Sequence, residues 1–364
     1  MAVQDGFPYE LLDQPITDRV AYFRHYTMAH PVLLNAAQIL MQTVREPAGI
    51  SLVFVFGPTG VGKSTLLRRV SQKLTEAMFA ALQQDQGRIP MTGIEAATPE
   101  FGQFDWKDFY LRALAAVQEP FIYPWSTSRL TTLKLRLALE HALRKRQLQV
   151  FYIDEAQNFA KVASARKLSD QTDAIKSLAN LTGVQFVLTG TYEVLMLRNL
   201  SAQLCRRSID IHFPRYRAEI PEDLQSFRGI VQTFQRHLPL PQEPNLLEQW
   251  EFCYERSLGC VGILKDWLSR ALVATLEAGA KTLTPQMLEQ HAWSLERCMI
   301  MLAEAKEEEK KLEVQPLQSA LRIALGLETA VVEPASPPTP SVSPRRTAIS
   351  AKPKRYPVGG GQHD

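Results

Sequence analysis

GPTGVGKST, at residues 57–65, matches the pattern G-x-x-x-x-G-K-[ST] of a phosphate-binding loop. The apolar run LVFVF precedes it and LLRRV follows it, which is the strand, loop and helix context that such a loop needs. Its glycines let successive backbone N–H groups turn toward phosphate oxygens, and the positive end of the following helix faces the same charge. The chain is therefore expected to bind a nucleoside triphosphate here.

The loop also predicts which side chains meet the ligand. Lys63 is expected to reach the β and γ phosphates of ATP, and Ser64 to offer its hydroxyl to Mg²⁺. The residues expected to surround the triphosphate are Gly57, Pro58, Thr59, Gly60, Val61, Gly62, Lys63, Ser64 and Thr65.

A second motif, VFYIDE, supplies two carboxylates at the end of an apolar run at residues 150–153. In a parallel sheet this run would end at the edge where the phosphate-binding loop opens. Asp154 is then expected to hold Mg²⁺ opposite Ser64, and Glu155 to orient and polarise the attacking water. The competing interpretation is a strand that simply leaves the core through acidic residues.

From residue 51 to about residue 214, apolar runs of strand length alternate with amphipathic stretches, which predicts an α/β fold with a five-stranded parallel sheet between helices. The expected strands are residues 52–56, 89–95, 149–153, 184–188 and 208–213. Beyond this point only helices are expected, at residues 222–238, 246–257, 263–278 and 285–313. This combination is typical of an AAA+ P-loop NTPase with a helical lid.

Four segments follow from this pattern. They are an N-terminal helical linker or adaptor at 1–48, the nucleotide-binding α/β core at 49–217, the helical lid at 218–313, and a C-terminal extension at 314–364. The extension is rich in Pro and Ser and then basic, so it is expected to be mostly disordered, with a basic tail that could dock on a partner or on DNA.

Composition sets the remaining limits. The 364 residues are 45% apolar and carry a formal net charge of +3, so any nucleic-acid binding must come from local patches. The N-terminus lacks the features of a signal peptide and no run is long enough to cross a membrane, which predicts a cytoplasmic protein with no membrane partner. The four cysteines match no metal pattern and are expected to be reduced and buried; they are Cys205, Cys253, Cys260 and Cys298.

Two further features bear on catalysis, and the first of them suggests that it needs more than one subunit. Arg206 and Arg207 precede the fifth expected strand, where in oligomeric ATPases an arginine projects into the neighbouring active site. They could equally bond local carboxylates or helix ends. Thr191, with Thr189 as the second choice, ends the fourth expected strand and could sense the γ-phosphate, although a threonine there is also a common turn or capping residue.

Taken in order, the stretches GPTGVGKST, FYIDEAQNF, FVLTGTYEVL and QLCRRSIDIHFPRY resemble the AAA+ transposition regulators called TnsC and TniB, as found in CRISPR-associated transposons. The resemblance runs from about residue 33 to residue 302. The chain departs from many AAA+ proteins at the start of the third lid helix, where it has no sensor arginine. Lys265 could replace it, but a solvated lysine is the favoured interpretation.

The resemblance implies an ATPase that assembles on duplex DNA as a ring or helical filament, driven by ATP. It also implies two protein partners, a target selector of the TniQ/TnsD type and a transposase of the TnsB/TnsAB type, which this chain would link. Hydrolysis of ATP would then disassemble the complex.

Candidate DNA contacts come from one stretch of basic and hydroxyl residues near an expected helix start, where phosphates can be bound without reading sequence. They are Lys107, Arg129, Thr131 and Lys134. The alternative is that Leu130, Leu133 and Leu137 form the buried face of this helix and the charges between them face water.

Other classes of function stay open. A GTPase is disfavoured because the chain has no N-K-x-D element, and an ABC-type ATPase because it has no L-S-G-G-Q signature. Another DNA-associated AAA+ ATPase, such as a helicase loader or an initiator-like protein, would share the sheet, lid and arginines. A nucleotide-dependent signalling switch would hold its nucleotide with little turnover.

Overall fold

The computed structural model describes residues 6–100, 104–119, 130–161, 165–200, 202–312 and 315–327. The chain divides into two compact units, Met1–Lys311 and Leu312–Asp364. The first contains the sheet and the lid, and the second contains one described helix. In the part of the chain that the structure describes, no helix is long and apolar enough to cross a lipid bilayer.

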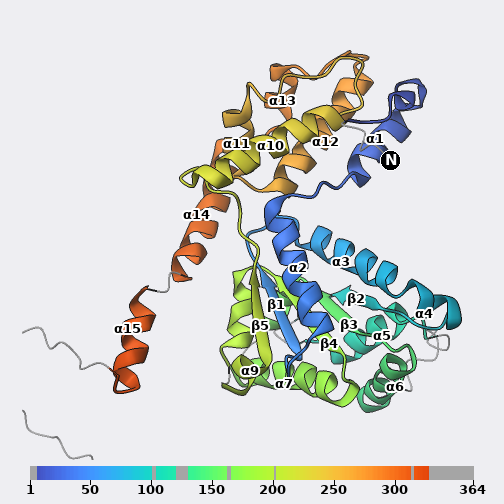
Figure 1. Ribbon diagram of the computed structural model, residues 1–364, viewed down its shortest axis with the longest axis vertical. Helices are drawn as coiled ribbons and strands as arrows, with labels where there is room; N and C mark the ends of the chain where they lie inside the picture. The colour runs from blue at the N-terminus through green and yellow to red at the C-terminus, as the bar shows by residue number, and fades with distance from the viewer. Residues whose placement is uncertain are drawn as a thin grey trace, which may run out of the picture. The chain divides into compact units, whose positions relative to one another are not determined.

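The centre of the first unit is a five-stranded sheet in the order β2-β3-β4-β1-β5, with every neighbouring pair parallel (Figure 1). The strands are β1 (Leu52–Phe56), β2 (Met91–Glu95), β3 (Val150–Asp154), β4 (Gln185–Gly190) and β5 (Ser208–His212). The predicted α/β fold with a five-stranded parallel sheet is confirmed. Because all strands run the same way, the segments that follow them meet at one edge.

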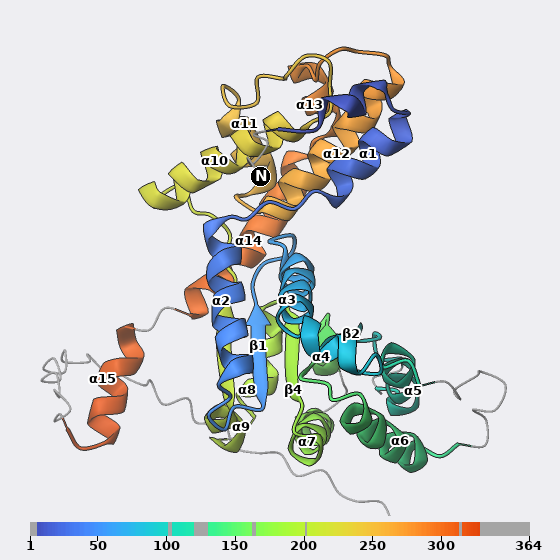
Figure 2. The same ribbon diagram turned by 45° about the vertical axis from the view of Figure 1, so that its right-hand side comes forward.

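Helices cover both faces of the sheet, so its central strands are apolar on both sides. On one face α2 (Pro31–Arg45) and α3 (Lys63–Ala77) pack through Leu40 and Leu66 against Val53 and Val55 of β1 (Figure 2). The other face packs against the 3-10 helix η3 (Ala156–Ala160), α7 (Ala165–Thr182) and α8 (Leu195–Arg198). The remaining elements of this part are α4 (Phe79–Gln84), α5 (Trp106–Ala116), α6 (Thr132–Lys145), η4 (Tyr192–Val194) and α9 (Ala202–Arg207).

The helices that follow the sheet in this unit are called the lid. All but the last of them contribute to a core that includes Phe234 and Trp267, and the last packs against the second. They are α10 (Pro221–His237), α11 (Trp250–Ser257), α12 (Val261–Glu277), α13 (Pro285–His291) and α14 (Leu295–Lys311). The N-terminal residues divide between the two cores. After the short η1 (Tyr9–Asp13), helix α1 (Ile16–His25) buries Val20 and Phe23 in the lid, whereas α2 joins the sheet.

The single helix expected at residues 285–313 is wrong, because the chain leaves the helix at Ala292 and starts a new one at Leu295. Trp293 fills the break, where the Arg270 guanidinium lies 4.7 Å from the centre of its ring. Ser294 then caps α14 by accepting a hydrogen bond from the N–H of Arg297. The sequence contains no proline or glycine here, so nothing local indicates the break.

Within the second unit the structure describes α15 (Gln315–Ala324), a helix that the sequence analysis did not predict in the C-terminal extension. The basic tail lies outside the described residues. The four cysteines are unpaired; Cys253, Cys260 and Cys298 are buried as expected, whereas the expectation was wrong for Cys205, which is exposed on α9.

Candidate nucleotide-binding site

The phosphate-binding loop has the backbone geometry that its glycines permit. Gly62 takes φ +110°, a left-handed conformation that favours glycine, directly before α3 begins at Lys63. At Gly57 a Cβ atom would lie 2.0 Å from the carbonyl oxygen of Phe213, so no larger residue fits. The loop is therefore a tight turn that exposes its N–H groups at the start of a helix, which suits a phosphate.

Lys63 lies inside this loop. Its side chain is buried, and its ammonium group donates hydrogen bonds of 2.9 Å to the carbonyl oxygens of Gly57 and Pro58. Burial lowers the pKa of Lys63, and the carboxylates of Glu155 and Asp154 oppose that effect. The two acidic residues and the lysine thus lie near enough to interact, although Lys63 begins α3 and the acidic residues lie at the end of β3.

Three donors hold the carboxylate of Asp154. Oδ2 accepts a 2.8 Å hydrogen bond from the Ser64 hydroxyl, and Oδ1 accepts one of 2.6 Å from the buried Thr189 hydroxyl. The backbone N–H of Glu155 also donates to Oδ1, at 3.0 Å. A hydroxyl beside a carboxylate is the kind of oxygen pair that Mg²⁺ prefers, so Ser64 and Asp154 fit the ion expected here.

Glu155 follows in an unusual backbone conformation, with φ +52°. Its carboxylate accepts a hydrogen bond from the side-chain amide of Gln157, which is buried on η3. The same amide group accepts a 3.2 Å hydrogen bond from the backbone N–H of Thr191. Sequence reasoning missed Gln157, and the only signal was its place two residues after Asp154-Glu155.

A cavity of about 310 Å³ opens beside the loop. Pro58, Thr59 and Thr191 line one side of it, and Glu304 and Glu308 of α14 line the other. Thr191 therefore lies at the phosphate end of the site, while Thr189, the second choice as a sensor, is bonded to Asp154.

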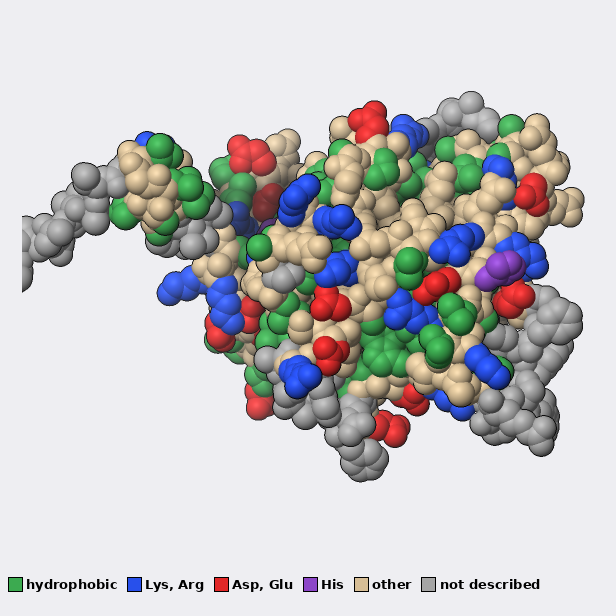
Figure 3. Space-filling view, turned by 90° about the horizontal axis from the view of Figure 1, so that it is seen from below, with side chains coloured by type: hydrophobic (Ala, Val, Ile, Leu, Met, Phe, Trp, Pro, Cys, Tyr) green, Lys and Arg blue, Asp and Glu red, His purple; other side chains and the backbone are tan. Residues whose placement is uncertain are grey.

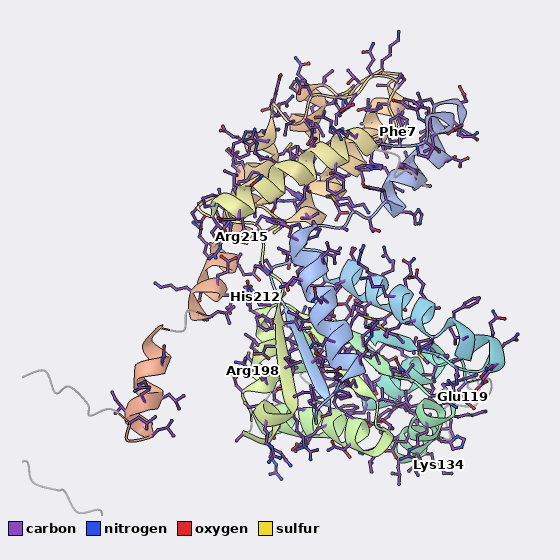
Figure 4. The ribbon with its side chains drawn as sticks, in the orientation of Figure 1. Phe7, Glu119, Lys134, Arg198, His212 and Arg215 are labelled. Atoms are coloured by element: carbon purple, nitrogen blue, oxygen red, sulfur yellow. The ribbon has the colours of Figure 1, made fainter. Side chains whose placement is uncertain are left out.

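Arg215 also borders this cavity, at the point where the chain leaves β5 for the lid (Figure 4). It is buried and donates two hydrogen bonds, of 3.0 and 3.1 Å, to the carboxylate of Glu309 on α14. Sequence analysis did not predict this pair, because its members lie 94 residues apart.

The lid touches the phosphate-binding loop directly at the start of α12. The backbone N–H of Ile263 donates a 3.2 Å hydrogen bond to the carbonyl oxygen of Gly60. A Cβ atom on Gly262 would lie 2.4 Å from that oxygen, so the two backbones are in close contact only because residue 262 is glycine. Movement of the lid and of the loop must therefore be coupled.

A small hollow of about 40 Å³ lies between the segment joining α1 to α2 and the lid, beside Gly62 and Thr65. Tyr26, Met28 and Lys265 are among the residues that line it. Lys265 lies on α12 as expected and is half-buried, so it is only partly solvated. Its ammonium donates a 2.7 Å hydrogen bond to the carbonyl oxygen of Arg24, and burial lowers its pKa.

Arg206 and Arg207 lie at the opposite edge of the sheet from the phosphate-binding loop. They precede Ser208, which pairs with Leu52 at the start of β1, whereas the loop follows Phe56 at its end (Figure 1). Arg206 is exposed, and Arg207 donates a 2.7 Å hydrogen bond to the side-chain oxygen of Asn180. Neither residue can reach the phosphates bound by its own chain.

The expected DNA contacts lie on or beside α5 and α6. Lys107 is half-buried in the first turn of α5, and Lys134 is exposed in the first turn of α6. Thr131 caps α6, since its hydroxyl oxygen accepts a hydrogen bond from the N–H of Lys134. Arg129 lies outside the described residues.

The alternative, that Leu133 and Leu137 form the buried face of this helix, is wrong. These side chains are 65% and 55% exposed, and α6 instead buries Leu135 and Leu139. Figure 3 shows the lower face of Figure 1, where the Lys and Arg side chains of the described residues are scattered among polar, acidic and apolar ones.

Comparisons with known proteins agree with this fold. Residues 48–197 match the family model described as an AAA domain. The ORC1 protein of Aeropyrum pernix, solved in complex with DNA, is 17% identical with a TM-score of 0.53, covering 79% of this chain and 70% of that chain. The ORC2 protein of Aeropyrum pernix is 15% identical with a TM-score of 0.49, and the match covers 72% of this chain and 67% of that chain. No curated protein sequence matches the chain. The chain thus has the fold of an AAA+ P-loop NTPase.

Proposed function

We propose that this protein is an ATPase that assembles on duplex DNA and connects a target-selecting protein to a transposase. The hydrolytic part of the proposal is supported by one arrangement, the meeting of Lys63, Ser64, Asp154 and Glu155 at the carboxyl edge of the sheet. The partners are proposed from the resemblance to the TnsC and TniB regulators.

In the proposed reaction the loop amides and Lys63 neutralise charge on the β and γ phosphates of ATP. Ser64 and Asp154 would hold Mg²⁺, which would supply further positive charge to the phosphates. Glu155 accepts a hydrogen bond from a water molecule and orients its oxygen toward the γ-phosphorus. The water oxygen would bond to phosphorus as the bond to the leaving ADP oxygen breaks, and the water proton would pass to Glu155 and then to the released phosphate. Thr191 would sense the γ-phosphate.

Assembly is proposed because the paired arginines and the nucleotide site lie at opposite edges of the same sheet. In a head-to-tail contact the amino edge of one chain faces the carboxyl edge of the next, so Arg206 or Arg207 would complete a neighbour's site. Such a contact repeats into a ring or a filament. Lys107, Thr131 and Lys134 would then contact DNA phosphates.

Electron microscopy of the purified protein with duplex DNA, in ATP, a non-hydrolysable analogue and ADP, tests this assembly. Rings or filaments around DNA are expected with ATP and the analogue, and their loss is expected with ADP. Monomers in every nucleotide state would exclude the proposal and favour a signalling switch. Rings that form on DNA but bind neither transposase nor target selector would favour a helicase loader or an initiator-like protein.

Mixed subunits test the shared active site separately. Lys63→Ala removes the phosphate ligand, and Arg206→Ala/Arg207→Ala removes the arginines, so each variant alone should lack ATP turnover. A mixture should regain part of it, because an intact nucleotide site can then face intact arginines. Absence of recovery at every mixing ratio would rule out completion by a neighbour.

A further inference from the structure

Gln157 connects two parts of the nucleotide site that are distant in sequence. Its side-chain amide nitrogen donates to a carboxylate oxygen of Glu155, and its amide oxygen accepts from the backbone N–H of Thr191. The side chain is 6% exposed, whereas the Glu155 side chain that it holds is exposed. One buried group therefore links the proposed base to the end of β4.

The surrounding chain keeps this amide in place. Gly190 ends β4 beside it, and a Cβ atom on Gly190 would lie 2.2 Å from the amide oxygen of Gln157. The backbone carbonyl of Glu155 also accepts a 2.9 Å hydrogen bond from the N–H of Asn158, which fixes the start of η3. These contacts hold Glu155 in its left-handed conformation, which few residues adopt without such support.

We propose that Gln157 is a positioning residue that sets the orientation of Glu155 according to the position of the β4 end at Thr191. This inference rests on the proposed ATP hydrolysis and adds a control element to the same site. With its amide nitrogen bonded to one carboxylate oxygen, Gln157 leaves the other oxygen of Glu155 available to a water molecule. A shift of Thr191 moves the amide oxygen, and the carboxylate follows.

The polarity of the amide explains why glutamine suits this position. Its two ends differ, so one end donates to a carboxylate while the other accepts from an N–H group. A leucine would make neither bond. A glutamate could still accept from Thr191, but it would face Glu155 with a like charge and push that carboxylate out of place.

The order of turnover numbers among variants therefore tests the proposal. ATP turnover of the full chain is measured with Mg²⁺ and duplex DNA, and nucleotide affinity is measured with a fluorescent ATP analogue. Gln157→Leu should lower kcat about 10-fold to 100-fold, because misplacing a reacting group by about 1 Å has effects of this size. Gln157→Glu should lower kcat about tenfold further through like-charge repulsion. KM and nucleotide affinity should stay within about threefold of the wild-type values, since binding groups are untouched.

A purely structural role predicts the reverse order, because glutamate has nearly the shape of glutamine and keeps the bond to Thr191. Gln185→Leu provides the matched control, since Gln185 is a second buried glutamine, lies at the start of β4, and donates to the carbonyl oxygen of Thr43. It should reduce stability and leave kcat unchanged. Gln157→Asn keeps the amide group, but its side chain is too short to make both hydrogen bonds, so it should lower kcat as Gln157→Leu does. It can be used in place of a Gln157 variant that does not fold.

Each outcome has one meaning. Wild-type kcat in the Gln157 variants, or a Gln157→Glu enzyme faster than Gln157→Leu, overturns the inference while ATP hydrolysis by the wild type stands. Parallel losses of kcat and nucleotide affinity in all variants, Gln185→Leu included, also overturn it. No turnover by the wild type under any assembly condition refutes the proposed function itself.

Discussion

Replacing Gly262 by alanine tests the coupling between lid and phosphate-binding loop. The new Cβ atom would lie 2.4 Å from the backbone carbonyl oxygen of Gly60, where ordinary contact begins at 3.4 Å. A backbone atom cannot rotate aside as a side chain can. The start of α12 and the loop must therefore separate by about 1 Å, and the hydrogen bond from Ile263 to Gly60 must lengthen.

Two opposing effects set the size of the change. Forcing extra volume into a packed contact costs about 1–3 kcal/mol. Alanine offsets at most about 1 kcal/mol of this by its greater helix propensity. We expect a net loss of about 1–2 kcal/mol in the free energy of unfolding. Because the loop that binds phosphate moves, the affinity for ATP should fall about tenfold, which corresponds to 1.4 kcal/mol.

Gly229→Ala is the matched control, because Gly229 lies within α10 and a Cβ atom there would meet nothing within 4 Å. It should raise the free energy of unfolding by about 0.5–1 kcal/mol and leave nucleotide binding unchanged. Denaturant unfolding and titration with a fluorescent ATP analogue measure both quantities. A Gly262→Ala protein as stable as the wild type, with wild-type affinity for ATP, would show that the close contact does not couple lid and loop.

Three further predictions concern stability and DNA binding. Burial, helped by the charge of Arg69, lowers the pKa of His30 from 6.5 to about 4. As the pH falls from 6.5 to about 4, His30 takes up a proton in the unfolded chain but not in the folded one. The free energy of unfolding should therefore drop by about 3 kcal/mol over this range. Denaturant unfolding across this pH range should show a smaller drop for His30→Gln. Arg215→Met leaves the Glu309 carboxylate without its ion-pair partner and should lower the free energy of unfolding by about 3 kcal/mol. Adding Glu309→Leu should restore part of this loss, and denaturant unfolding measures both changes. Lys134→Ala should weaken DNA binding and reduce the slope of log affinity against log salt by about 0.9; an unchanged slope would remove Lys134 from the DNA surface.

The sequence predicts the sheet well because burial on both faces leaves a simple pattern. The strand expected at residues 52–56 is β1 (Leu52–Phe56), which is apolar throughout and fully buried. The apolar run of the fourth strand spans residues 184–188 in the sequence, whereas β4 is Gln185–Gly190. Thr189 follows this apolar run, and because it is polar it suggests the end of a strand. In the fold, however, its hydroxyl is buried against Asp154. Local pattern thus fails where a polar side chain finds a distant partner.

The same reason limits prediction of the candidate site. The motif at residues 57–65 consists of neighbouring residues in one short stretch, so the loop and its lysine can be recognised in the sequence. Gln157 and Arg215 are not, and neither is the bond from Lys265 to Arg24, because each of these contacts joins segments that are far apart along the chain. The lid contact at Gly262 is hidden in the same way, since a glycine in a helix indicates close packing without naming the partner.

Strand direction connects these observations to the proposed assembly. In a parallel sheet the loops that follow the strands share one edge, so Lys63 and Glu155 meet there, and whatever precedes the strands is held at the other edge. Arg207 is fixed at that second edge by Asn180, and β5 separates it from the phosphates of its own chain along its full length. No hinge at the lid alters this separation, because both ends belong to the sheet. If these arginines act in hydrolysis, they act on another chain, and ATP turnover then depends on assembly.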